Sequence, residues 1–116
     1  MSLLEVERDA VIDGRSDRIM KDWSTGLDHA LATLERLARE VAEVQVQGDY
    51  NQRRTARSTQ IAKLEQIKGI ATRWNEGFEP FQINAIGLPA GADGVDIAAV
   101  QQTIDRIRME QSLDRR

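Results

Sequence analysis

The sequence predicts an all-α protein: a long antiparallel helical hairpin with two shorter flanking helices in a small bundle, and an ordered non-helical strap before the last helix. Two apolar stripes carry this prediction, because their residues recur at the spacing of 3 and 4 that is typical of amphipathic helices. The short turn Gly48-Asp49-Tyr50-Asn51 separates them. The first stripe is Met20, Trp23, Leu27, Ala30, Leu34, Leu37, Val41 and Val44, and the second is Ile61, Leu64, Ile67, Ile70, Ala71 and Trp74.

The composition favours the same class. The chain has 116 residues, which suits a single helical domain over 1–116 with one modest core. Only 4% of the residues are aromatic, whereas a β-sandwich or barrel normally carries more aromatic and β-branched residues. No apolar run approaches the roughly 20 residues of a membrane helix, and the acidic start lacks the basic region of a signal peptide. We therefore expect a cytoplasmic protein or a part of a soluble assembly.

The first two helices are expected over residues 3–12 and 17–47. Gly14 is predicted to end the first helix, because glycine readily adopts the left-handed conformation that follows a last turn. Ser16 or Asp17 can cap the second helix through a side-chain oxygen.

The second arm of the hairpin is expected over residues 50–76. Gly48 supplies the stop before it, and Asp49 with Gln52 three residues later resembles a capping box. Gly77 is predicted to end this helix. A fold at residues 48–49 places Trp23 level with Trp74.

The strap is expected over residues 78–95, which contain both prolines and several glycines. Its scattered apolar residues argue against a free linker, and Phe81-Gln82-Ile83 alternates like a short strand or an extended segment. The sequence leaves open whether the strap packs on its own hairpin or on a neighbouring subunit. Asp93 or Asp96 can cap the last helix, 96–112, whose stripe is Ile97, Val100, Ile104 and Ile107.

Four of the five aromatic residues fall near the open end of the predicted hairpin. They are either a hydrophobic plug that closes this end or a docking patch for a partner protein, since interface energy concentrates in such residues. The candidate docking residues are Trp23, Trp74, Phe78 and Phe81.

Positive charge is concentrated on one predicted helix. Residues 52–74 contain six Lys or Arg residues and one acid, although the chain as a whole has a net charge of −3. Cations at a helix start are disfavoured by the helix dipole. Either the helix begins near Ser58, or facing acids such as Glu40 and Glu43 compensate, or a basic tip meets an acidic protein or a phosphate backbone. The candidate basic tip is Arg53, Arg54, Arg57 and Lys63.

The sequence holds no pattern that points to catalysis. There is no cysteine, which excludes thiol chemistry and thiolate zinc sites, and His29 is the single histidine. No phosphate-binding loop or nucleophile constellation is present. We therefore expect no enzyme activity, cofactor, metal or small-molecule substrate, and we expect His29 at a surface or boundary position.

These observations together favour a non-enzymatic structural, assembly or adaptor protein that acts through helix–helix contacts. Long helices with continuous apolar seams suit a homo-oligomer or a complex with another protein. A subunit of a larger bacterial or bacteriophage complex fits this description. One alternative is a nucleic-acid-associated protein that uses the basic helix start. Another is a regulatory or inhibitory binder that uses its acidic C-terminal half.

Overall fold

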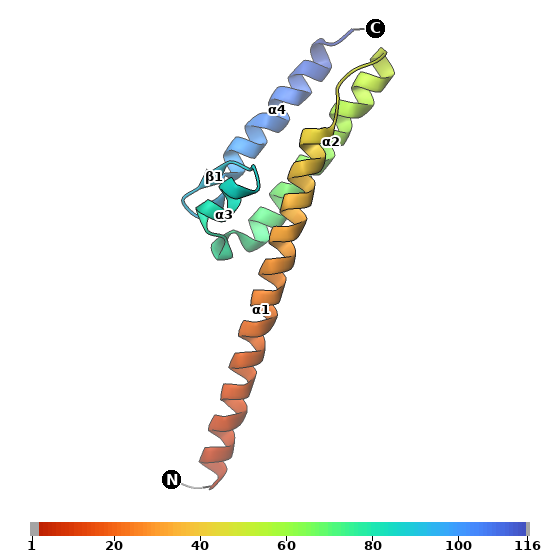
Figure 1. Ribbon diagram of the computed structural model, residues 1–116. Coiled ribbons are helices and arrows are strands. Elements are labelled where there is room, and N and C mark those ends of the chain that lie inside the picture. The colour runs from red at the N-terminus through yellow and green to blue at the C-terminus, as the bar shows by residue number, and fades with distance from the viewer. Residues whose placement is uncertain (1–2, 116) are drawn as a thin grey trace.

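The structure, a computed structural model, describes the backbone of residues 3–115 and the side chains of residues 23–115. It is an all-α bundle in which two long helices form an antiparallel hairpin and a third packs on the second (Figure 1). The elements in chain order are α1 (Leu3–Glu43), α2 (Tyr50–Trp74), a 3₁₀ turn (Asn75–Gly77), α3 (Pro80–Ala85), β1 (Ala90–Gly91), β2 (Gly94–Val95) and α4 (Ile97–Leu113).

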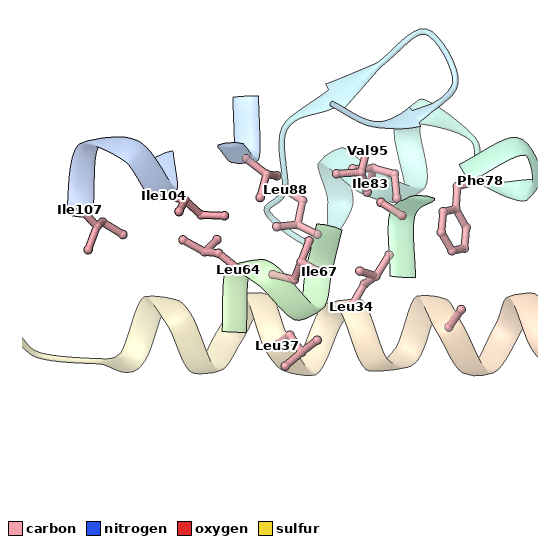
Figure 2. Close-up of a cluster of buried hydrophobic side chains, with 13 residues drawn as sticks. Leu34, Leu37, Leu64, Ile67, Phe78, Ile83, Leu88, Val95, Ile104 and Ile107 are labelled. Atoms are coloured by element: carbon pink, nitrogen blue, oxygen red, sulfur yellow. The ribbon is translucent and has the colours of Figure 1, made fainter. Parts of the chain in front are cut away.

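Helix α2 is the middle layer of this bundle. Helices α1 and α4 both pack along it, whereas α1 and α4 make little contact with each other. The α3 and β1–β2 segment covers the end of the bundle where α2 finishes (Figure 1). The core, shown in Figure 2, confirms most of the predicted stripe residues among the described side chains. Trp23 is exposed, and the Met20 side chain lies outside the described side chains. The buried residues of the core are Ala30, Leu34, Leu37, Leu64, Ile67, Ala71, Phe78, Ile83, Leu88, Val95, Val100, Ile104 and Ile107.

Helix α1 differs from the prediction. The expected helices 3–12 and 17–47 are one continuous helix, and the predicted break at Gly14 is wrong. A glycine inside a helix costs only about 1 kcal/mol relative to alanine, and no proline follows Gly14 to enforce a stop. The 41 residues of α1 span roughly 60 Å, so α1 continues far beyond the end of α2 (Figure 1). This extension accounts for the long axis of the molecule, 79 Å against 25 and 21 Å.

The turn between α1 and α2 matches the prediction except for the end of α1. This helix ends at Glu43 rather than at residue 47. Just after its end, Val44 N–H donates to the Val41 carbonyl at 3.3 Å. The capping box is confirmed, because the Asp49 side chain accepts from Gln52 N–H at 2.8 Å and the Gln52 side chain accepts from Asp49 N–H at 2.9 Å. Gly48 has a φ of 92° and provides the reversal before the cap.

The segment 78–95 is ordered, as predicted, but it is not wholly non-helical. The prediction of a strand or extended segment at Phe81-Gln82-Ile83 is wrong, because these residues belong to α3. A second capping box explains the helix: Glu79 precedes Pro80, and Glu79 N–H donates to the Gln82 side chain at 3.0 Å.

The rest of this segment is fastened to its own chain. Ala90 pairs with Val95 in the small antiparallel hairpin, and Asn75 exchanges two hydrogen bonds with the Val95 backbone at 2.9 Å each. Asp96 then caps α4 by accepting from Ala99 N–H at 3.1 Å. Among the described residues, no helix combines the length and the apolar character needed to cross a membrane.

Two glycines of this fold provide a matched test. We expect Gly69→Ala to stabilise the protein by about 1 kcal/mol, because Gly69 lies inside α2 and an added Cβ meets nothing within 4 Å. We expect Gly94→Ala to destabilise it by about 2 kcal/mol, because Gly94 has a φ of 98° and the new Cβ would lie 2.6 Å from Asn75 Oδ1. Urea unfolding measures both changes, and equal effects of the two substitutions would contradict the described backbone.

Candidate docking surfaces

The first candidate surface surrounds the two tryptophans. The register prediction is confirmed, because the rings of Trp23 and Trp74 lie 4.9 Å apart between centroids with a tilt of 35°. Gly26 allows this packing, since a Cβ there would lie 2.5 Å from the Trp74 ring. The Arg73 guanidinium lies 5.2 Å from the Trp74 ring centroid, in a cation–π contact.

This tryptophan surface, defined as Trp23, Gly69, Ile70, Arg73 and Trp74, remains open to solvent. Trp23 is 44% exposed, and the other four residues line a shallow hollow on α2. Large aromatic side chains that are half exposed beside an aliphatic one are typical anchors of protein interfaces. The surface lies where α1 leaves the bundle.

The two phenylalanines of the predicted patch lie in different environments. Phe78 is buried at one end of the core (Figure 2), whereas Phe81 is 70% exposed on α3. The structure therefore brings together Trp23 and Trp74, uses Phe78 for packing, and leaves Phe81 as a separate exposed residue. The sequence did not separate these roles because α3 was not predicted.

The second candidate surface is an apolar groove between α1 and α4, here called the α1–α4 groove. Helix α2 and the loop before β1 also contribute to its lining, and its volume is about 230 Å³. It exists because α1 and α4 each pack on α2 and hardly on each other. The residues that line it are Ala38, Val41, Ala42, Leu64, Ile67, Gly87, Leu88, Pro89, Val100 and Thr103.

The predicted basic tip is largely neutralised within the chain. Helix α2 begins at Tyr50 and not near Ser58. The acid that compensates its start is Asp114, at the end of α4, rather than Glu43. Arg53 donates to it at 2.9 Å, and Arg57 donates to it at 2.5 Å.

We call the group of Arg53, Arg57 and Asp114 the C-terminal clamp. Hydrogen bonds from Arg53 and Arg57 hold the pKa of Asp114 well below its usual range, and the same contact raises the pKa of Arg53. Arg53 also donates to the Gly48 carbonyl at 2.8 Å, so it fastens the α1–α2 turn to the end of α4.

The other two basic residues behave differently. Lys63 pairs with Glu40 on α1 at 2.7 Å, as facing charge compensation predicts. Hydrogen bonds from Lys63 and then Arg36 lower the pKa of Glu40. Arg54 is exposed on the outside of the bundle. The sequence missed the clamp because Asp114 is far away along the chain and lies beyond the predicted end of the last helix.

The described residues contain no group of three or more His, Asp or Glu side chains placed to hold a metal ion. His29 is exposed, as predicted. Comparisons of the chain with protein-family models, with curated proteins and with solved structures find no match. The described residues form two apolar surfaces and one internal charge cluster as candidate sites.

The clamp predicts a pH-dependent effect of one substitution. We expect Asp114→Asn to lower the urea midpoint at pH 7, whereas Asp28→Asn, at an exposed position of α1, leaves it nearly unchanged. The folded-state pKa of Asp114 is depressed. Its ion pairs therefore contribute fully to the free energy of unfolding when the pH is above the unfolded-state pKa of roughly 3.9. This contribution declines as the pH falls toward the folded-state pKa. The difference in urea midpoint between the Asp114→Asn variant and the unchanged protein should thus become smaller below about pH 4. A difference that is constant from pH 7 to pH 3 would contradict the charge pairing.

The tryptophan pair predicts a measurable coupling. A double-mutant cycle with Trp23→Ala and Trp74→Ala should give an interaction energy of about 0.5–1.5 kcal/mol, because the rings are in tilted contact. The matched cycle with Trp74→Ala and Phe81→Ala should give about zero, since Phe81 is largely exposed on another element. Equal couplings in the two cycles would show that the tryptophan contact is not a specific one.

Proposed function

We propose that this protein is a non-enzymatic assembly or adaptor protein that works through helix–helix contacts, with copies of itself or with another protein of a larger complex. The observation that carries this proposal is the N-terminal arm, defined as residues 3–22 of α1. Among the described residues, no other element lies beside this arm (Figure 1). An isolated helix of this length is only marginally stable in water, because most helical stability in proteins comes from tertiary packing. The arm is therefore suited to packing on a partner.

The two docking surfaces support the same proposal. The tryptophan surface lies at the base of the arm, and the α1–α4 groove offers aliphatic side chains from three helices. Both surfaces are mainly apolar and lie mostly on helices, and helices pack on one another through such ridges and grooves. A ring or connector subunit of a bacterial or bacteriophage complex is one component that would use such surfaces.

The charges of α2 favour protein contacts over a phosphate backbone. Arg53, Arg57 and Lys63 each pair with an acid of the same chain, so fewer cations remain for an electrostatic interface of the kind that nucleic-acid binding requires. We accordingly assign the partner role to the helix surfaces. The acidic C-terminal half likewise contributes Asp114 to the clamp.

The mass in solution tests this proposal. Light scattering coupled to size exclusion should give at least twice the chain mass of 13.1 kDa. The mass should persist in high salt, because apolar contacts are not screened by ions. Trp23→Ser should reduce the association, and Phe81→Ser, a matched change at a second exposed aromatic residue, should not. A monomer at every concentration and salt level would contradict self-association.

A further inference from the structure

We infer that the partner of the N-terminal arm is the α1–α4 groove of a second copy of this chain, in a two-fold antiparallel dimer. This inference rests on the proposed function and names its partner. Each arm would supply the fourth helix that the bundle of the other copy lacks. Four-helix packing is the usual closed solution for helices of this kind, whereas a middle helix flanked by two others leaves one groove open.

The lengths of the two halves of α1 agree with this arrangement. Trp23 is the central residue of α1, since Leu3–Glu43 extends equally on both sides of it. A two-fold axis at Trp23 therefore makes the arm of one copy as long as the bundled half of α1 in the other. The axis also brings the half-exposed Trp23 residues of the two copies toward each other, which would cover the tryptophan surface.

The register places apolar sequence at the groove. About a two-fold axis at residue 23, positions 3–8 of one copy come level with positions 38–43 of the other, and Ala38, Val41 and Ala42 line the groove there. Positions 3, 4 and 6 of the sequence are Leu, Leu and Val. The groove volume of about 230 Å³ exceeds the roughly 150 Å³ of a cavity that holds one benzene molecule. It is thus large enough for more than one aliphatic side chain.

Charge complementarity supports the same register. Residues 3–13 of the arm contain four acids and one arginine. The first turns of α2, residues 50–63, contain four basic residues and no acid, and they pack beside the end of α1 through the Lys63–Glu40 pair. Arg53 and Arg57 share the one acid Asp114, and Arg54 is exposed. In this register the acidic arm would lie at the same end of the bundle as these basic residues.

Distances between identical spin labels test the geometry in the full-length protein, which has no native cysteine to interfere. His29→Cys and Arg39→Cys each place one label on the exposed side of α1. A two-fold axis at residue 23 predicts label separations of about 20 Å for position 29 and about 50 Å for position 39, from the helical rise and the spacing of packed helices.

Any other set of distances contradicts the inference and indicates a different arrangement. Short and equal distances at both positions would indicate parallel pairing of α1, and about 50 Å already at position 29 would indicate that the arms pair only with each other. Either result leaves the proposed function standing, because the protein would still assemble through helices. No dipolar coupling together with a monomer mass would contradict the inference and the self-association form of the proposed function, and would leave a different protein as the partner of the arm.

One substitution and its matched control test the groove itself. Ala38→Glu places a charge on the groove wall and should weaken dimerisation by about tenfold or more, since it leaves an unpaired charge in an apolar contact. Ala32→Glu makes the same change at an exposed position of the same helix and should leave dimerisation unchanged. Equal dimerisation of the two variants would exclude the groove as the binding site.

Discussion

The packing of helix α2 between α1 and α4 is the constraint on which the rest of the structure depends. Leu64, Ile67 and Ala71 are buried on α2, and both neighbouring helices obtain their core contacts from this one helix. Because α1 and α4 are held by α2 rather than by each other, their separation follows from its diameter, and the α1–α4 groove is the consequence. The clamp at one end and the α3–β hairpin at the other then fix the direction of α4.

The docking surfaces follow from the same arrangement. Helix α2 has 25 residues and α1 has 41, so a helix hairpin of unequal arms must leave part of α1 without an internal partner. Trp74 is the last residue of α2, and its ring contacts that of Trp23. An aromatic pair therefore lies where the packing of α1 on α2 ends. Burial, exposure and helix length therefore converge on one end of the hairpin.

The sequence predicted the features that depend on local pattern. The stripes predicted most of the buried residues of α1, α2 and α4 that the structure describes. The Asp49–Gln52 capping box, the Asp96 cap and the Trp23–Trp74 register were also confirmed. The sequence failed where a local signal competes with its surroundings. Gly14 resembles a stop but lies within a helix, and Phe81-Gln82-Ile83 resembles a strand but follows a capping residue and a proline. The clamp and the groove depend on residues that are far apart in the chain, so no local sequence pattern predicted them.

Hydrogen exchange of the backbone amides of residues 3–22 is the most direct test of the central claim, which is that α1 extends beyond the bundle in order to pack on a partner helix. In the full-length protein, at a concentration where it associates, we expect these amides to be protected to a degree similar to those in the middle of α1. The protection should decrease on dilution. Exchange at the rate of an unfolded peptide, at every concentration at which the rest of α1 is protected, would contradict the account.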